Sequence, residues 1–237
     1  MRVVSYNIRS GLEQGLESVA QVITALDADL VALQEVDSRT VRSGAVEQVA
    51  ELAARCGYGH HQFFSATPWE GGGEYGLGLL SRQRLSETAT VQLPVDGPDA
   101  HPSATEPRIV ATATLPWGLK VLNTHFGLTN SQRTRQARLV AELSRQAGEP
   151  LILLGDFNAV PEDPVLDPLR AVLHDAAAEL SPAERVSFPL PAPGVAIDHV
   201  FLSRCLKAHS IRVAREAAGA SDHWPVVLEL EPASAAD

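Results

Sequence analysis

A carboxylate and an amide lie two residues apart, directly after a short apolar run in the second half of the chain. The run reads Leu-Ile-Leu-Leu-Gly at residues 151–155, and Asp156 and Asn158 follow it. A carboxylate at the end of a buried strand costs free energy unless it meets a metal ion, water or hydrogen-bond donors. Such residues also form turns in which the side chain bonds its own backbone. The segment alone therefore leaves a catalytic site and a simple turn equally open.

An acid and an imidazole stand side by side near the end of the sequence, as Asp222 and His223, ahead of another apolar segment. Because adjacent residues of an extended strand point to opposite faces, these two need a turn or a bulge to share one site. Asp198 starts an earlier apolar stretch, where it could orient an imidazole and favour its charged form. We take His223 as its partner, although Asp198 and the following His199, taken alone, read more simply as a surface pair.

Two further polar residues, Glu35 and His125, end apolar segments of their own. A lone histidine in such a place is more often a hydrogen-bonded core residue than a catalyst. The same pattern, a polar residue at the end of an apolar segment, recurs several times along the chain. Because each such side chain is costly to bury, so many are not expected by chance, and a shared functional site becomes the better interpretation. We therefore predict one shared site from eight residues: Asn7, Glu35, His125, Asp156, Asn158, Asp198, Asp222 and His223.

Oxygen-bearing side chains dominate this set, and they indicate a hard divalent cation such as Mg²⁺ or Mn²⁺. Such an ion polarises a phosphoryl oxygen and stabilises the alkoxide that leaves. The sequence has no HExxH segment and no paired cysteines, so zinc is the less favoured alternative. The other histidines are expected to be surface or structural residues, and the cysteines to be unbridged packing residues: His60, His61, His101, His174, His199, His209, Cys56 and Cys205.

The elements that must position these side chains begin with a strand over residues 2–8, a helix over 16–26 and a strand over 29–36. Apolar residues recur at helical spacing in the second of these segments and run together in the third. Asn7 and Glu35 thus fall near the carboxyl ends of two strands. Ligands of α/β sheets collect at such ends, so this opening supports the predicted site.

Further helices are predicted over residues 45–56 and 131–147, each followed by a glycine that favours a helix end. Segments rich in Gly, Pro and Asp, at residues 67–74 and 94–106, are predicted to be loops at the mouth of the site. Strands predominate in the second half, which favours an α/β fold of two packed mixed β-sheets flanked by helices, a four-layer α/β sandwich. The remaining strands are expected over residues 61–65, 76–81, 85–93, 108–115, 120–125, 150–155, 196–202, 209–214 and 224–230.

Length and composition are typical of a globular chain. The 237 residues, 45% hydrophobic and 20% charged, are compatible with one domain over residues 1–237. The formal net charge of −10 opposes tight non-specific binding to duplex DNA, which draws on many contacts from Lys and Arg to phosphates. The sequence starts on a strand and has no apolar run of membrane-spanning length. We therefore expect a monomeric, cytoplasmic protein without a transmembrane segment.

In their order along the chain, the motifs resemble those of the endonuclease/exonuclease/phosphatase superfamily, which includes deoxyribonucleases, abasic-site endonucleases, sphingomyelinases and inositol phosphatases. Each motif is short, but the ordered set spans nearly the whole chain and is specific. The matching segments are Ser-Tyr-Asn7, Leu-Gln-Glu35, Tyr75-Gly through Leu-Ser-Arg82, Glu-Pro-Arg108, Asn-Thr-His125, Gly-Asp156-Phe-Asn158, Ile-Asp198-His and Ser-Asp222-His223.

The resemblance implies a set of metal-binding residues. Glu35 would be the principal ligand of the ion, and Asn7 and Asp222 would bind it directly or through water. The ion implied is Mg²⁺ or Mn²⁺, in agreement with the oxygen-bearing side chains. Tyr75 and Arg108 match the family motifs less firmly, and they would either contact the substrate or pack at the rim of the site.

The resemblance also implies how the remaining residues would act. Asp156 would orient or deprotonate the attacking water. His125 and Asn158 would bind the phosphoryl oxygens. His223, held by Asp198, would stabilise the charge that develops on phosphorus or assist proton transfer.

The sequence therefore predicts a divalent-metal-dependent hydrolase that cleaves a phosphate ester by attack of water, as a phosphodiesterase or a phosphatase. The substrate stays open between a small or lipid-derived ester and an end of DNA or RNA, because kinship of fold does not settle it. A catalytically silent binding domain on the same fold is the rival from another class. Every matched position carries a chemically competent side chain, which favours the enzyme.

Overall fold

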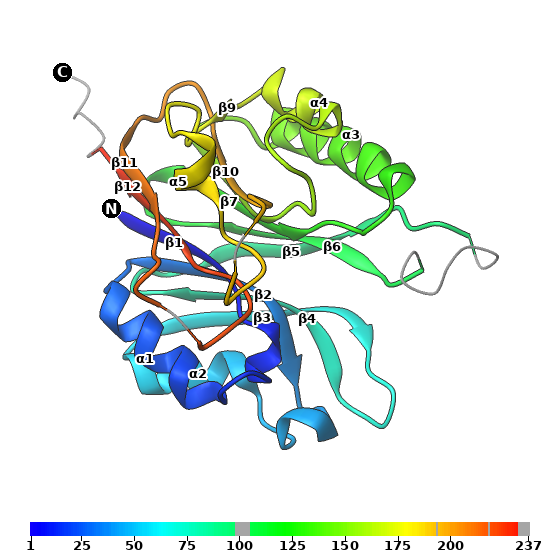
Figure 1. Ribbon diagram of the computed structural model, residues 1–237, viewed down its shortest axis with the longest axis vertical. Coiled ribbons are helices and arrows are strands. Elements are labelled where there is room, and N and C mark those ends of the chain that lie inside the picture. The colour runs from blue at the N-terminus through cyan, green and yellow to red at the C-terminus, as the bar shows by residue number, and fades with distance from the viewer. Residues whose placement is uncertain (98–104, 193, 218, 232–237) are drawn as a thin grey trace.

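Two six-stranded mixed sheets pack face to face, and helices cover their outer faces (Figure 1). This computed structural model describes residues 1–97, 105–192, 194–217 and 219–231. The arrangement confirms the predicted fold of two packed mixed sheets flanked by helices. The central strands of both sheets, such as β2 (Leu30–Ser38) and β8 (Leu151–Asp156), are buried on both faces, which explains their nearly continuous apolar runs in the sequence, whereas the edge strands are largely exposed.

The first sheet takes its strands from the two ends of the described chain. Its order is β11-β12-β1-β2-β4-β3, with β1 parallel to β2 and all other neighbours antiparallel. Helices α1 (Leu16–Leu26) and α2 (Gln48–Cys56) pack on its outer face through a shared apolar cluster. The strands are β1 (Arg2–Asn7), β2 (Leu30–Ser38), β3 (His60–Pro68), β4 (Glu74–Ser81), β11 (Ala208–Val213) and β12 (Val226–Leu230).

The second sheet has the order β5-β6-β7-β8-β10-β9, with β7 parallel to β8. Helix α3 (Asn130–Ala147) covers its outer face and begins at a capping box, in which the Thr129 hydroxyl accepts from the Gln132 N–H and the Thr129 N–H donates to the Gln132 side chain. The short helix α4 (Asp167–Arg170) extends that layer. The strands are β5 (Ser86–Leu93), β6 (Arg108–Thr114), β7 (Lys120–His125), β8 (Leu151–Asp156), β9 (His174–Asp175) and β10 (Asp198–Leu202).

The inner faces of the sheets meet in one apolar core, to which strands of both contribute, such as Val3 of β1 and Ile152 of β8. The next residue of β1, Val4, belongs instead to the outer cluster under the helices, as the alternation of a strand requires. A polar bridge crosses this core beneath the site. Asn123 of β7 accepts from Gln34 Nε2 at 2.7 Å and donates to the carbonyl of Leu33 at 2.9 Å. Both amides are fully buried, so the bridge fixes the register between the two sheets.

Most predicted elements lie where the sequence placed them, and α1 and β7 agree with the prediction at both ends. The predicted helix start at residue 45 is wrong: α2 begins at Gln48, because Ala45 has a left-handed φ of 57° and Arg39 donates to Val46 in a turn. Part of the predicted loop at 67–74 continues the β3–β4 hairpin. The predicted loop at 94–106 lies partly outside the described residues.

Several short elements were not expected from the sequence. They include the helix α5 (Pro182–Arg185), α4 and β9. Each spans four residues or fewer, too little for a hydrophobic period to show. The structure also contains the 3₁₀ helices η1 (Arg9–Gly11), η2 (Val41–Ser43), η4 (Pro116–Gly118) and η5 (Pro164–Leu166).

Candidate active site

Strand register brings three of the predicted residues into one row of the second sheet. His125 ends β7 and pairs with Asp156, which ends the parallel strand β8. Asp198 begins β10, which runs antiparallel to β8, and it pairs with Asp156 from the other side. All three residues are at least 94% buried. Adjacent strands therefore deliver two carboxylates and an imidazole to one end of the sheet.

The backbones of β7 and β8 approach each other closely at Gly155, the residue before Asp156. Its φ is 145°, and a Cβ placed there would lie 1.9 Å from the carbonyl oxygen of Thr124. Any other residue would push β7 and β8 apart. The glycine thus sets how closely the ends of these two strands, and so His125 and Asp156, can lie.

Glu35 reaches the site through an irregularity in the first sheet. The pairing of β2 with β4 shifts between Leu33 and Val36, and Glu35 adopts a left-handed φ of 53°. A bulge of this kind turns a side chain out of the regular alternation of its strand. Because a non-glycine residue pays a conformational cost for positive φ, the surrounding contacts must hold Glu35 in place.

Asn7 links the two sheets at the site. Its Nδ2 donates to Glu35 Oε1 at 3.0 Å and to Asp156 Oδ2 at 3.1 Å. Its Oδ1 accepts from the backbone N–H of Arg9 at 3.1 Å. The amide nitrogen, and not the oxygen, therefore faces the carboxylates, so in this arrangement Asn7 positions Glu35 and Asp156.

Asn158 combines the two alternatives that the sequence left open. Its backbone N–H donates to Asp156 Oδ1 at 2.9 Å, which is the local turn, and its own φ is 48°. Its Nδ2 also donates to the carbonyl of Phe126 at 2.9 Å. The turn thus holds Asn158 beside the end of β7, with the side chain half-buried at the site.

His223 is held by a carboxylate, as predicted. Its Nδ1 bonds Asp198 Oδ2 at 2.9 Å, and the same oxygen accepts from the Ser187 hydroxyl at 2.6 Å. Burial alone would lower the pKa of His223, but Asp198, with Asp156 and Asp222, raises it to about 10. The imidazole is therefore a cation at neutral pH. Adjacent residues of an extended strand would face opposite ways, but the chain bends at residues 221–223. His223 therefore enters the site next to Asp222.

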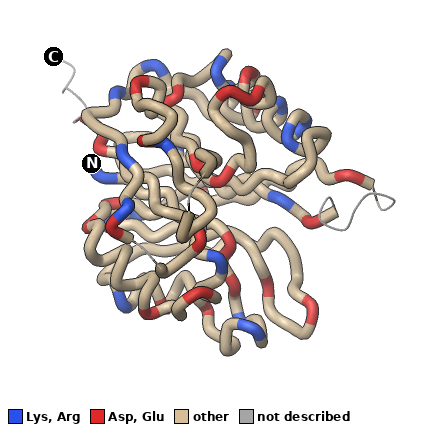
Figure 2. The backbone as a smooth tube through the Cα atoms, in the orientation of Figure 1, with Lys and Arg blue, Asp and Glu red and all other residues tan. Residues whose placement is uncertain are grey.

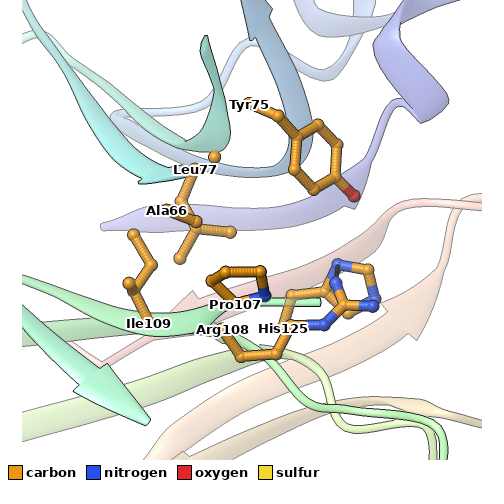
Figure 3. A pocket seen from close by; sticks show the side chains of 8 residues that line it. Ala66, Tyr75, Leu77, Pro107, Arg108, Ile109 and His125 are labelled. Atoms are coloured by element: carbon orange, nitrogen blue, oxygen red, sulfur yellow. Dashed lines mark hydrogen bonds between the residues drawn. The ribbon is translucent and has the colours of Figure 1, made fainter. Parts of the chain in front are cut away.

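His125 has the opposite environment. The Nη1 of Arg108 lies 2.8 Å from His125 Nδ1, and both side chains are buried. Burial, then Arg108 and His223, lower the pKa of His125 well below its ordinary value. Figure 3 shows the Arg108 head group beside the imidazole in a small pocket, with Tyr75 across it. This imidazole is therefore neutral.

Asp156 lies between the two imidazoles. Its Oδ2 is 3.5 Å from His125 Nε2 and 3.7 Å from His223 Nε2. Burial, then Asp198, raises the pKa of Asp156 to about 7, although His223 acts in the opposite direction. A carboxyl group with such a pKa can gain or lose a proton near neutrality, as a group that activates water must.

Glu35 and Asp222 supply the remaining acidic charge. Burial raises the pKa of Glu35, the Asn7 hydrogen bond and His223 oppose that effect, and Asp222 adds to it. Asp222 is half-buried and lies 3.4 Å from Arg9 Nη1. Several carboxylates thus gather with few cations among them, and the oxygen donors fit a hard divalent ion. Among the described residues, Asp198 Oδ1 is buried and has no hydrogen-bond partner. This oxygen could therefore accept a further donor or contact a cation.

A second group could hold an ion on distance alone. One ligand atom each from Asp156, Asp198 and His223 lie within 4.8 Å of one another. The Asp198–His223 hydrogen bond and the raised pKa of His223 argue against it, because a histidine ligand must be neutral. That Glu35 and Asp222 bind the ion stays a prediction from the sequence.

The residues given no catalytic role mostly lie where expected. The described histidines at the surface, His60, His61, His174 and His209, are exposed. His199 is a buried structural residue that bonds the Ala159 carbonyl at 2.7 Å through Nε2, so the surface-pair reading of Asp198 and His199 is wrong. His101 lies outside the described residues. Cys56 is half-buried and unbridged, whereas Cys205 is exposed in the turn after β10 and does not pack.

Sequence reasoning missed Ser187, which is fully buried and bonds Asp198. It lies in a proline-rich stretch that lacks any hydrophobic period, so no signal marked it. The contact between Arg42 and Trp69 was also missed. The Arg42 guanidinium lies 3.5 Å from the centroid of the Trp69 ring and pairs with buried Asp37 at 2.7 Å. A lone arginine and a lone tryptophan carry no such signal in sequence.

A two-sheet fold with carboxylates, amides and histidines at the strand ends defines a class of hydrolytic domains, and the comparisons agree. The family model described as the Endonuclease/Exonuclease/phosphatase family matches residues 4–223. The chain belongs to this family. No curated protein matches the sequence. Among the described residues, no helix is long and apolar enough to cross a membrane.

Solved structures with the same fold include three informative neighbours. An endonuclease/exonuclease/phosphatase from Beutenbergia cavernae DSM 12333 is 25% identical, with a TM-score of 0.78 over 98% of this chain and 71% of that one. A mannosyl-6-phosphatase from Bacteroides thetaiotaomicron VPI-5482 is 22% identical, with a TM-score of 0.73 over 98% and 100%. The human Nocturnin catalytic domain with bound sulfate is 22% identical, with a TM-score of 0.72 over 98% and 93%.

Proposed function

We propose that this protein is a divalent-metal-dependent phosphoesterase that hydrolyses a small or terminal phosphate ester by attack of water. One observation carries the proposal: the buried carboxylate of Asp156 lies between a cationic and a neutral imidazole, and Asn7 ties it to Glu35. Such a group could activate water beside a charged phosphoryl group. Membership of the family supports the same chemistry.

Glu35 would hold the ion, with Asp222 as a second ligand and Asn7 as the residue that fixes the Glu35 carboxylate. When bound, Mg²⁺ or Mn²⁺ would polarise the phosphoryl oxygen and stabilise the leaving alkoxide. Asn7 itself presents a nitrogen to Glu35, so its oxygen would reach an ion only after the amide rotates, or through water. Burial, and then the half-buried carboxylate of Asp222, raise the pKa of Glu35, which supports binding of positive charge here.

The protein groups divide the remaining work. Asp156 would orient the attacking water and accept its proton. The imidazolium of His223 would stabilise the negative charge that develops on phosphorus, and Asp198 and Ser187 would keep it protonated and oriented. His125 and Asn158 would donate to the phosphoryl oxygens from the other side of Asp156.

The charge distribution supports a substrate with few phosphates. Lys and Arg are scattered among Asp and Glu over both layers in Figure 2, and no continuous basic stripe runs along the described chain. With a net charge of −10, tight binding to long duplexes is disfavoured. The similar mannosyl-6-phosphatase is named for a sugar phosphate, which makes small sugar phosphates a natural first group to assay.

The test is a panel of phosphomonoesters, phosphodiesters, phospholipids and short DNAs, each assayed with Mg²⁺, with Mn²⁺ and with chelator. We expect turnover of a small ester that chelator abolishes and Mg²⁺ or Mn²⁺ restores. Glu35→Gln is the matched control, since it removes one ligand charge at nearly constant volume and should lose turnover while it stays folded. Turnover that survives chelation and the Glu35→Gln change would contradict metal dependence, and no turnover at all would favour a silent binding domain.

A further inference from the structure

Arg108 and His125 form a pair whose hydrogen-bond roles follow from chemistry alone. The distance from Arg108 Nη1 to His125 Nδ1 is 2.8 Å. A guanidinium carries only donors and stays protonated in proteins, so His125 Nδ1 must accept. An imidazole that accepts at Nδ1 and is neutral carries its proton on Nε2. That nitrogen lies on the side of Asp156, 3.5 Å from Oδ2.

The arginine is held firmly enough to impose this choice. Its side chain is 6% exposed, and an ion pair joins the same Nη1 to Glu106 Oε1 at 3.2 Å. The pocket that contains Arg108 and His125 is walled by Tyr75, Pro107 and neighbouring apolar residues (Figure 3). Protonating His125 at Nδ1 would aim two donors at each other within this buried pocket, so the doubly protonated ring is excluded as well.

We propose that Arg108 is a positioning residue that fixes His125 as the neutral, Nε2-protonated tautomer, so that His125 is a hydrogen-bond donor to a phosphoryl oxygen and not an acid, a base or a cation. The tautomer follows from the contacts of the protein itself. The phosphoryl part rests on the proposed function. The lowered pKa of His125 agrees with a neutral ring.

This assignment divides the labour between the two histidines of the site. His223 has a carboxylate behind Nδ1, and that arrangement requires a proton on Nδ1. His125 has a guanidinium behind Nδ1, and that arrangement forbids one. Only His223 can therefore present a charged ring to the substrate. An arginine that donates to Nδ1 of an imidazole thus leaves Nε2 as a hydrogen-bond donor while the ring stays uncharged.

The first experiment reads the tautomer directly by ¹⁵N NMR of the imidazole rings, in chelated protein without substrate. Comparison with the His125→Gln spectrum assigns the ring. We expect an unprotonated Nδ1 and a protonated Nε2 for His125 in the wild type. Arg108→Met keeps a long apolar stem without donors and should release the ring to a mixture of tautomers, whereas Arg108→Lys retains a donor and should restore the wild-type form. A proton on Nδ1 in the wild type, or an unchanged ring in Arg108→Met, would overturn the proposal.

The second experiment uses glutamine and asparagine as mimics of the two ring nitrogens. The amide nitrogen of Gln reaches the place of Nε2, and that of Asn the place of Nδ1. Loss of one donor to a developing oxyanion costs on the order of 10²–10³-fold in rate. We expect that loss in kcat/KM for His125→Ala and His125→Asn, with His125→Gln restored to within about tenfold of wild type. Equal inactivity of the Gln and Ala variants, both folded, would overturn the donor role.

Failure of the two proposals can be told apart. If no phosphate ester is turned over but the NMR result holds, the proposed function fails and the tautomer assignment stands. If turnover is found but Nδ1 carries the proton, the proposed function stands and Arg108 has no positioning role. The first experiment needs neither a metal nor a substrate, which keeps the two outcomes independent.

Discussion

The surroundings of His223 and His125 show how one residue type acquires opposite properties a few ångströms apart. Both rings are buried and both turn Nε2 toward Asp156. The difference lies behind them, where Asp198 contacts one Nδ1 and Arg108 the other. Burial disfavours a charged ring in both places, so the carboxylate must outweigh burial, whereas the guanidinium adds to it. The partner behind the ring therefore decides its charge.

The largest effect is expected from Asp156→Asn, because this side chain contacts both imidazoles and would activate the water. Loss of a general base costs on the order of 10²–10⁴-fold in rate. We expect a fall in kcat of that size, with a metal requirement like that of wild type, measured by steady-state kinetics. An unfolding titration is the control. A folded Asn variant with near wild-type kcat would remove Asp156 from the chemistry.

The next test compares glutamine at the two histidine positions. His223→Gln removes a cation, which an amide does not replace, so kcat/KM should fall on the order of 10²–10³-fold. His125→Gln keeps a donor and should be much milder. The ratio of the two effects, measured on the same substrate and metal, sharpens the comparison. Equal losses at both positions would contradict the contrast between a cation and a neutral donor.

Asp198→Asn should reduce kcat by about 10–100-fold, in the range of losses for residues that orient a functional group from behind. The change removes the largest stabiliser of the His223 cation. The alkaline limb of the rate profile should therefore move from near pH 10 toward the ordinary histidine pKa of 6.5. KM should change less than kcat. An unshifted alkaline limb would show that another group sets it.

The stability of the chelated protein should also depend on His223. Its pKa is about 10 in the folded protein and ordinarily 6.5. The folded state therefore holds the proton more tightly, so the stabilisation is fully present below pH 6.5 and is lost as the pH rises through 10. Urea titrations at pH 6.5 and pH 10 should show a smaller fall in unfolding free energy for Asp198→Asn than for wild type. An equal fall in both proteins would contradict this origin.

The smallest effect is expected from Ser187→Ala, which removes one of the two hydrogen bonds to Asp198 Oδ2. The remaining bond still holds His223. A single hydrogen bond contributes about 1 kcal/mol, so kcat should fall by several-fold at most, and the alkaline limb should stay near its wild-type position because Asp198 still contacts His223. Ser181→Ala, at an exposed position on the same stretch, is a matched control. A loss as large as that of Asp198→Asn would mean that Ser187 has a more direct role.

Strands and polar strand ends could be predicted from the sequence. An apolar run indicates a buried strand, and a polar residue at its end, such as Asp156 or His125, indicates a side chain that needs a partner. The long helix α3 was visible through its period and its end at Gly148. The turn at Asn158 was also foreseeable, since this residue type favours it. Local signals of this kind cover much of the fold and name the side chains that the structure brings together.

What lay beyond prediction depends on contacts between distant segments. The bulge that redirects Glu35 is a mismatch between β2 and β4, and neither strand reveals it alone. The pairing of Arg108 with His125 needs the register of β6 on β7. The orientation of the Asn7 amide depends on carboxylates of both sheets. The residue types indicate the chemistry, but tertiary contacts determine the charge of each side chain and the direction in which it points.

The order of strands has a consequence for how the enzyme is made. The second sheet is built from one continuous stretch, β5 to β10, whereas β1 stays half-paired until β12 arrives more than 200 residues later. Synthesis proceeds from the N-terminus, so the second sheet can form while the first still has an open edge. Asp222 and His223 lie just before β12 and enter the site as that edge is covered. A nascent chain in which β12 has not yet paired with β1 therefore does not hold the His223 imidazole at the site.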